Sequence, residues 1–302
     1  MSALIRLLLL LLVSTSVHAE LLFEQAAPGV FVHHGAHQDL SEGYAGDICN
    51  ISFIVGSKGV AVIDSGGSLK VGQQLHAAIR KATALPILYV INTHVHPDHI
   101  YGNAAFVAEK ATFVGHAKLA GAMEQRKEAY ARLNQQWMGD AFAGSELVKP
   151  VLEVADTATL DLGDRQLQLQ AHPLAHTNTD LTIQDSLSGT LWTGDLLFVE
   201  RTPSIDGDIK GWIAVIDRLK KSTATQMVPG HGPVVKDWLS ALDREQGYLK
   251  RLLDDVRASI KNGGTMEKAM ETAAADEKNN WQLFDIVNRR NVNMIYPGLE
   301  WE

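Results

Sequence analysis

A cluster of metal-ligand side chains directly follows a strand-like apolar run. Residues 92–99 read Asn-Thr-His-Val-His-Pro-Asp-His, and the preceding run is Ile87–Ile91. Neutral imidazole and carboxylate are good zinc ligands. Crowding them together costs electrostatic repulsion and desolvation unless a cation lies among them. The segment therefore predicts a metal site on a loop at the end of a buried strand.

Residues Met1–Ala19 have the pattern of a cleavable signal peptide. Arg6 supplies a positive charge, Leu7–Val13 is apolar, and residues 17–19 form a small-residue cleavage pattern. The apolar stretch is too short to span a bilayer, and polar residues follow it. We therefore predict export to the periplasm without a stable membrane anchor. A retained N-terminal anchor is the alternative.

Composition narrows the classes of partner. The formal net charge is −8, which argues against DNA or RNA because nucleic-acid binding needs a basic face. The single cysteine, Cys49, excludes an intrachain disulfide, and its apolar neighbours predict a buried, inert thiol in a strand. The roughly 280 residues left after cleavage can bury a large core, in one domain with or without an appendage.

Strand and helix patterns alternate from residue 30 to residue 114. The apolar runs Ile48–Val55 and Val60–Asp64 predict one hairpin, and Leu181–Asp185 with Thr190–Thr193 predict another in the second half. Helical patterns such as Ser68–Ala82 lie between and beside the strands. Two strand-rich halves with helices on their outer flanks predict two packed sheets between helical layers.

The pattern after Pro233 is helical only. Asp237–Ile260 has its apolar residues on one face, and Thr265–Ala275 and Trp281–Arg290 continue the helical pattern. We predict three parts: a signal peptide over residues 1–19, a main domain over residues 20–235, and a helical C-terminal extension over residues 236–302. The extension is predicted to dock on the main domain.

Five motifs occur in a fixed order between residues 62 and 232. They are Val62-Ile63-Asp64, the cluster from His94 to His99, Ala175-His176-Thr177 with Thr179-Asp180, Trp192-Thr193-Gly194-Asp195, and Pro229-Gly230-His231-Gly232. This ordered set resembles the metallo-β-lactamase superfamily over about residues 30–235. The resemblance implies an α/β fold, the αββα sandwich, with a binuclear metal site at the open edge of its two sheets.

The resemblance also assigns roles to individual residues. It implies that one metal is bound by His94, His96 and His176, the other by Asp98, His99 and His231, and that Asp195 bridges both. His172 competes with His176 for its position, and the Thr-x-Thr-Asp that follows favours His176. Supporting roles, in orienting ligands or backbone, are predicted for Asp64, Thr93 and Asp180.

Two cations bridged by a carboxylate can also share a water. Metal binding can lower the pKa of that water from 15.7 to about 7, which supplies hydroxide at neutral pH. The predicted reaction is therefore metal-hydroxide hydrolysis of an ester, thioester, lactone or amide of a small molecule, with Asp98 as the catalytic residue that orients the hydroxide. Two zinc ions per subunit are predicted; iron or manganese could replace them, because all ligands are nitrogen or oxygen.

Differences between this sequence and known members of the superfamily limit the range of candidate substrates. The resemblance to the commonest class B β-lactamases would place Cys at Asp195 and Lys at Phe198, so β-lactam hydrolysis is only an alternative. Residues 47–51, 194–199, 203–207 and 290–302 are most similar to exported zinc hydrolases of the quinoprotein relay or sulfur-oxidation type. That similarity predicts a periplasmic quinoprotein dehydrogenase system as a partner. A non-catalytic metal-binding accessory factor for such a dehydrogenase is the second alternative.

Two segments are candidates for the pocket wall. Arg201, in the loop after Asp195, is predicted to contact an anionic substrate. The segment Trp137–Pro150 places apolar side chains beside glycines, which is typical of a pocket wall or lid. Docking of this segment against the C-terminal helices is the alternative.

Overall fold

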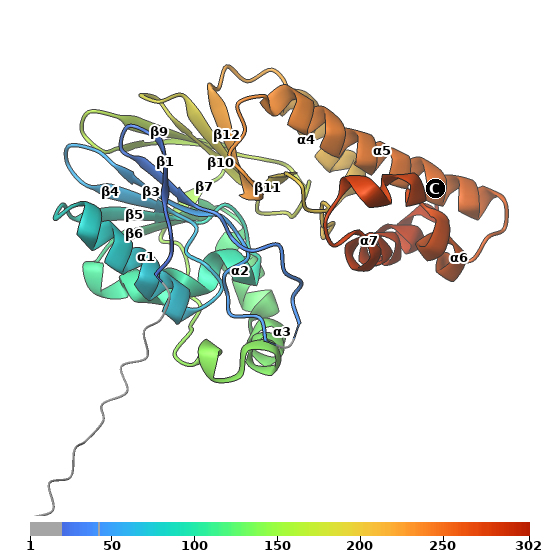
Figure 1. The fold of residues 1–302 in the computed structure, drawn as a ribbon, viewed down its shortest axis with the longest axis horizontal. Helices are drawn as coiled ribbons and strands as arrows, with labels where there is room; N and C mark the ends of the chain where they lie inside the picture. The colour runs from blue at the N-terminus through green and yellow to red at the C-terminus, as the bar shows by residue number, and fades with distance from the viewer. Residues whose placement is uncertain (1–19, 42) are drawn as a thin grey trace, which may run out of the picture.

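Two β-sheets pack face to face in the computed structural model, which describes residues 20–41 and 43–302 (Figure 1). The predicted signal peptide, residues 1–19, lies outside the described residues. The first sheet has seven strands in chain order: β1 (Glu24–Ala27), β2 (Val30–His33), β3 (Ile51–Val55), β4 (Val60–Ile63), β5 (Ile87–Ile91), β6 (Thr112–His116) and β7 (Leu152–Val154). The second has five, in the order β12-β11-β10-β9-β8: β8 (Thr157–Asp161), β9 (Gln166–Ala171), β10 (Leu181–Asp185), β11 (Thr190–Phe198) and β12 (Gln226–His231).

The core between the sheets follows from strand periodicity. In β9, buried Leu167 and Leu169 alternate with exposed glutamines, so one face of this strand points inward. They join Ile54, Ile63 and Trp192 in one apolar cluster drawn from both sheets. Burial of this shared cluster holds the sheets together and fixes the position of the loops at their ends.

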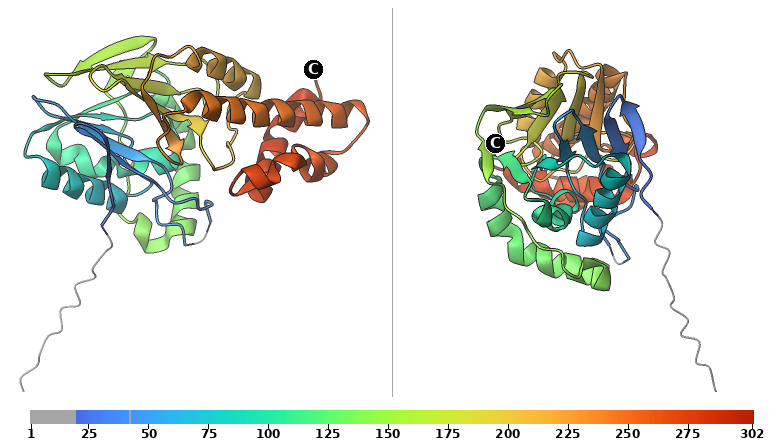
Figure 2. Two further views of the ribbon diagram at one scale, coloured as in Figure 1. Left: turned by 45° about the horizontal axis from the view of Figure 1, so that its top comes forward. Right: turned by 90° about the vertical axis from the view of Figure 1, so that its left-hand side faces the viewer.

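Helices cover the outer face of each sheet (Figure 2). On the first sheet, α1 (Leu69–Ala82) begins at Ser68, whose hydroxyl accepts a hydrogen bond from the Val71 amide, and its apolar face packs with Phe53 and Val62. The α2 turn (Pro97–Ile100), the 3-10 helix η1 (Tyr101–Glu109) and α3 (Leu119–Met138) complete this layer. On the second sheet lie α4 (Ile209–Leu219) and α5 (Trp238–Lys261). The predicted αββα sandwich is confirmed.

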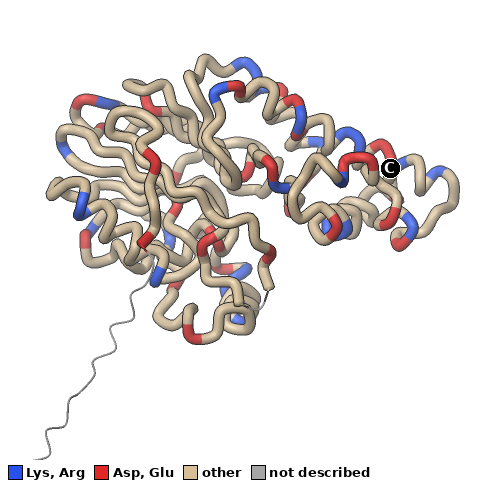
Figure 3. Tube along the Cα trace, viewed as in Figure 1, with Lys and Arg blue, Asp and Glu red and all other residues tan. Residues whose placement is uncertain are grey.

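The C-terminal region is helical, as predicted, and joins the core of the second sheet. It comprises α5, α6 (Met266–Thr272), the 3-10 helix η3 (Ala275–Asn280) and α7 (Phe284–Leu299). Tyr248 and Val292 of these helices share one apolar cluster with Leu197 and Trp212. Lys and Arg are interspersed with Asp and Glu along these helices (Figure 3).

Polar contacts tie α7 to the loop after β11. The Asn291 side chain accepts a hydrogen bond from the Ile205 amide at 2.9 Å and donates one to the Pro203 carbonyl at 2.7 Å. Asn291 is fully buried. Because a buried amide needs partners, these bonds fix the position of the loop relative to the helix. The extension thus contacts a loop that the sequence had marked as a pocket wall.

Several element boundaries differ from the sequence predictions. Strand β11 continues to Phe198 instead of ending at Thr193, because all nine of its residues are buried between β10, β12 and the covering helices. Cys49 is buried as predicted but precedes β3, so its predicted place in a strand was wrong. Among the described residues, no helix is long and apolar enough to cross a membrane.

Candidate metal centre

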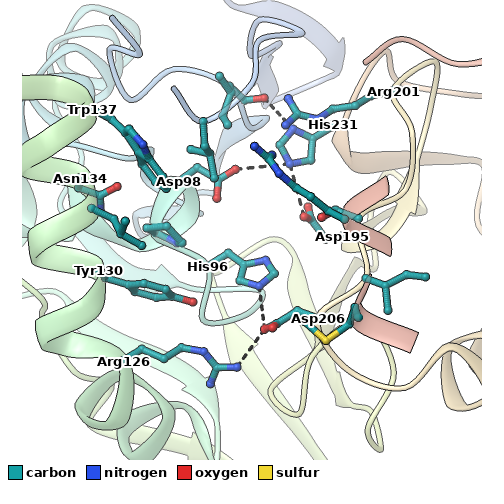
Figure 4. A pocket seen from close by; sticks show the side chains of 18 of the residues that line it. His96, Asp98, Arg126, Tyr130, Asn134, Trp137, Asp195, Arg201, Asp206 and His231 are labelled. Atoms are coloured by element: carbon teal, nitrogen blue, oxygen red, sulfur yellow. Dashed lines mark hydrogen bonds and ion pairs between the residues drawn. The ribbon is translucent and has the colours of Figure 1, made fainter. Parts of the chain in front are cut away.

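The five motifs meet at one edge of the sandwich. Strand β4 runs parallel to β5, and β11 runs parallel to β12, so the carboxyl ends of each pair lie together. Asp64 follows β4, the cluster from His94 to His99 follows β5, and β12 ends at His231. Asp195 lies in β11, and His176 lies in the loop between β9 and β10. Figure 4 shows His96, Asp98, Asp195 and His231, which come from three of these segments, around one pocket.

Two groups of ligand atoms share Asp195. In the first, the ligand atoms of His94, His96, His176 and Asp195 all lie within 4.8 Å of one another; in the second, those of His99, Asp195 and His231 do so. From Asp195 Oδ2, His94 Nε2 is 3.6 Å away, and His176 Nε2 and His231 Nε2 are each 3.4 Å away. The structure therefore brings five predicted histidine ligands together around one carboxylate, that of Asp195.

Asp98 reaches the second group from the α2 turn. Its Oδ2 lies 3.4 Å from His231 Nε2 and 3.5 Å from His99 Nε2. The backbone carbonyl of Asp98 accepts a hydrogen bond from the Cys49 thiol at 2.9 Å. Burial raises the pKa of Cys49 well above its ordinary value, with nearby carboxylates adding to the effect. Cys49 therefore stays protonated and supports the turn that carries Asp98.

Hydrogen bonds behind the cluster orient its imidazoles. Asp64 Oδ2 lies 2.8 Å from His99 Nδ1 and accepts a bond from the Thr93 hydroxyl at 2.7 Å. The Thr93 hydroxyl oxygen is also 3.0 Å from His94 Nδ1. In both rings Nδ1 is thereby engaged and Nε2 is turned to the cluster, which is how outer carboxylates and hydroxyls orient metal ligands. Asp64 and Thr93 lie where their supporting roles require.

Two backbone positions are specialised for this close packing. Asp64 has a positive φ of 53°, an uncommon conformation for a residue with a side chain. A methyl group at Gly230 would overlap Asp195 Oδ1, so the Pro-Gly-His turn needs glycine to let β12 approach the shared carboxylate. The backbone at these two positions therefore contributes to the close approach of the ligand-bearing segments.

The donor geometry fits a metal centre. The Nε2 atoms of His94 and His99 are buried without a hydrogen bond, and such orphaned polar atoms are costly unless something else satisfies them. Tetrahedral ligands about 2.1 Å from zinc are about 3.4 Å from each other. His176 Nε2 and His96 Nδ1 are 3.1 Å apart, and the contacts to Asp195 Oδ2 run from 3.4 to 3.6 Å. The spacing is that of atoms sharing a cation.

The buried imidazoles and carboxylates strongly shift one another's ionisation. Burial lowers the pKa of His99, but the carboxylates of Asp195, Asp98 and Asp64 outweigh it and hold this pKa well above its ordinary value. Burial likewise opposes ionisation of Asp195, but the surrounding imidazoles hold the pKa of Asp195 well below its usual range. His99 and Asp195 thus favour each other's charged forms, and a divalent ion bound among them would be the dominant local charge.

A carboxylate that the sequence did not single out holds His96. Asp206 Oδ2 lies 3.1 Å from His96 Nε2, and the same oxygen accepts a hydrogen bond from Arg126 Nη2 at 2.9 Å. His96 therefore presents Nδ1 to the cluster, facing His176. The sequence signal was weak, because Asp206 lies 110 positions from His96 in the chain.

The loop that carries His176 is shaped by Asp180. Asp180 accepts hydrogen bonds from the Thr177 amide at 2.9 Å and the Thr177 hydroxyl at 2.6 Å. Burial raises the pKa of Asp180 to about 7, although these bonds oppose the shift. His172 lies outside the cluster, 2.9 Å from the Thr182 hydroxyl, so the structure places His176 and not His172 among the candidate ligands.

A pocket of about 440 Å³ opens onto the cluster. One wall comes from α3, with Arg126, Tyr130 and Trp137, and α7 contributes to the opposite side (Figure 4). Trp137 therefore lines the pocket, as predicted for a residue of a pocket wall. Met138 and Phe142 instead pack near Tyr101 in a core cluster of the first sheet's helices, so the alternative of docking against the C-terminal helices was wrong for them.

Sequence and structure comparisons identify relatives of this architecture. Residues 44–243 match the family model of the Metallo-beta-lactamase superfamily. A linear primary-alkylsulfatase from Pseudomonas sp. (strain ATCC 19151) is 25% identical over 224 residues, which are 59% of this chain and 40% of the alkylsulfatase. An acyl-coenzyme A thioesterase from Bos taurus is 25% identical over 236 residues, 65% of this chain and 80% of the thioesterase. The chain therefore spans less than half the length of the alkylsulfatase.

Solved structures share the fold at lower identity. The sec-alkylsulfatase Pisa1 from Pseudomonas sp. superposes with a TM-score of 0.69 at 19% identity, over 92% of this chain and 50% of the alkylsulfatase. A metallo-β-lactamase from Pontibacter korlensis superposes with a TM-score of 0.62 at 20% identity, over 76% of this chain and 99% of its own. At these identities the matches support the fold alone.

Proposed function

The chain belongs to the metallo-β-lactamase superfamily, and we propose that it is a zinc-dependent hydrolase that cleaves an ester-like bond of a small molecule. The observation that carries the proposal is the sharing of Asp195 by two groups of imidazoles. Bound divalent ions would supply an activated water and a Lewis acid at such a site. The residues of the chain would hold the ions, position the water and bind the substrate.

The geometry supports a role for each residue of the cluster. His94, His96 and His176 are proposed to hold one ion, His99, His231 and Asp98 the other, and Asp195 both. Asp98 lines the pocket beside the second group, so its carboxylate is placed to accept a hydrogen bond from the attacking water and to take up its proton. The pocket walls would exclude bulk water once substrate is bound.

A second part of the proposal concerns where the protein acts and with which enzyme system. We propose that the protein is exported to the periplasm, where it acts beside a quinoprotein dehydrogenase or a sulfur-oxidation system. The signal-peptide pattern of residues 1–19 and the similarity over residues 290–302 support this. The identified relatives act on a sulfate ester and on an acyl thioester by their names, so both bond types belong among the candidate substrates.

A panel of probes tests the hydrolase proposal. Zinc-loaded protein is expected to hydrolyse at least one of an acyl thioester, an alkyl sulfate, a lactone and a β-lactam, and a chelator or Asp195→Ala should abolish that turnover. The cluster at Asp195 is the reason, since removing the shared carboxylate leaves both groups of imidazoles incomplete. If none of the four probes is hydrolysed and the protein binds tightly to a periplasmic dehydrogenase, the accessory-factor alternative would be supported instead.

Arg201 is proposed to bind an anionic group of the substrate. Its Nη1 donates a hydrogen bond to the Gln38 carbonyl at 3.0 Å, while its Nε is buried without a partner. The residue lines the pocket and is only 6% exposed. A buried guanidinium with unused donors is suited to bind an anion in a charge-assisted hydrogen bond.

Arg201→Ala is expected to raise KM for an anionic substrate by roughly 10-fold or more, because a hydrogen bond to a charged group contributes about 1.5–3 kcal/mol. The value of kcat should change little, since Arg201 does not touch the cluster. Steady-state kinetics on a matched pair of anionic and neutral substrates give the measurement. An unchanged KM for the anionic substrate would remove this role from Arg201.

A further inference from the structure

One face of α3 lines the pocket, and its two aromatic side chains also border the core cluster of this helical layer. Arg126, Tyr130, Leu133 and Trp137 recur at spacings of four, three and four residues and all line the pocket. This spacing places them along one side of the helix. Other faces of α3 carry buried Leu119 and other core residues. Three of the four side chains, those of Tyr130, Leu133 and Trp137, are large, mainly apolar and half-buried, and Figure 4 shows Tyr130 and Trp137 facing the pocket.

The opposite wall includes one apolar side chain of α7, Met294, beside the polar Arg290 and Asn293. Met294 is 45% exposed, so a ligand in the pocket could cover it. Leu40 and buried Ile205 extend this wall towards the cluster. We call the space between these residues and the α3 face the α3–α7 slot. Apolar surface on both sides of a slot is stabilised when an apolar ligand displaces its water.

One of the arginines that line the pocket can bind an anionic group of a ligand. Of the three arginines that line it, Arg126 is paired with Asp206, and Arg290 forms two hydrogen bonds with Asp39 at 2.6 and 3.0 Å. Arg201 has no carboxylate partner among residues 20–41 and 43–302. The pocket therefore offers one unpaired cation beside the cluster and an apolar slot next to it.

We propose that the α3–α7 slot binds an alkyl or acyl chain, so that the substrate is an amphiphile with an anionic group near Arg201 and its scissile bond at the cluster. This inference rests on the proposed hydrolase function and adds the class of substrate to it. A compact polar substrate would leave Leu133, Trp137 and Met294 in contact with water, whereas a chain of several methylenes covers them. Burying each methylene contributes about 0.8 kcal/mol, or up to about fourfold in affinity.

Binding of alkanesulfonates tests the slot without any turnover, because their carbon–sulfur bond is not hydrolysed. The affinities of butane-, hexane- and octanesulfonate for the zinc-loaded protein are measured by calorimetry, below their micelle concentrations. We expect affinity to rise with chain length, by up to about fourfold per methylene. Leu133→Asn and Met294→Asn should each flatten this rise and leave the affinity for methanesulfonate unchanged.

Leu239→Asn is the matched control. Leu239 lies on α5, is 47% exposed like Met294, and is not among the residues that line the pocket. Its substitution should leave the chain-length dependence intact. Equal affinity for all chain lengths in the wild-type protein, or an equal flattening by Leu239→Asn, would overturn the slot. Chain-length-dependent binding without hydrolysis of any probe would instead overturn the hydrolase function and keep the slot.

Discussion

Asp98→Asn is expected to lower kcat by roughly 10²- to 10⁴-fold while the protein stays folded. The asparagine amide cannot accept the proton of an attacking water. It also removes one negative charge from the group at His99 and His231, whose Nε2 atoms lie 3.5 and 3.4 Å from Asp98 Oδ2. We therefore expect the variant to bind less than two equivalents of zinc and to show little turnover of the best probe substrate.

Asp39→Asn provides the control for the loss of charge. Asp39 pairs with Arg290 at the pocket, but it belongs to neither group of ligand atoms. Its substitution should leave kcat within a factor of a few of wild type and metal content unchanged. Similar circular dichroism and Tm for both variants would show that folding is not the cause. Wild-type turnover in Asp98→Asn would contradict the role of this carboxylate.

The candidate ligands could be predicted from the sequence because they lie in short motifs at or near the ends of predicted strands. His94, His96 and His99 follow an apolar run that can only be a buried strand, and the structure places them where that strand ends. Parallel pairing of β4 with β5 and of β11 with β12 then brings Asp64 and Asp195 to the same edge. The order of the motifs, through the family resemblance that it supports, predicted which residues form the cluster, and the strand pairing explains why they meet. Metal binding by these residues stays a prediction.

The pocket around the cluster could not be predicted from the sequence in the same way. Tyr130, Leu133 and Trp137 have the spacing of a core-facing helix stripe, and the sequence cannot distinguish a face that meets a core from one that meets a cavity. Asp206 and Arg126 meet across 80 positions, and each is an ordinary surface-type residue in its own segment. Only the packing of α3 against the sandwich and the anchoring of the 203–207 loop by Asn291 bring them together.

The cluster makes stability depend on bound metal. Asp64, Asp98 and Asp195 are buried together, and like charges held close in a site of low dielectric repel one another. The hydrogen bonds from Thr93 and the imidazoles offset part of this repulsion. The remainder, together with the orphaned Nε2 atoms of His94 and His99, is a free-energy cost in the metal-free fold that a bound cation would remove.

Purified protein is therefore expected to contain close to two equivalents of divalent metal, and removing them should abolish hydrolysis and lower Tm. With free metal at about 1,000 times Kd, binding to the folded state alone contributes about 4 kcal/mol. For a chain of this size that corresponds to a Tm shift on the order of 10 °C. Metal analysis and thermal unfolding with and without chelator give the two measurements. Asp195→Ala should lose most of the metal-dependent shift, whereas Asp39→Asn should keep it, because only Asp195 is shared by both groups of ligands. One equivalent or none in the wild-type protein, with a Tm insensitive to chelator, would contradict a binuclear centre at this edge of the sheets.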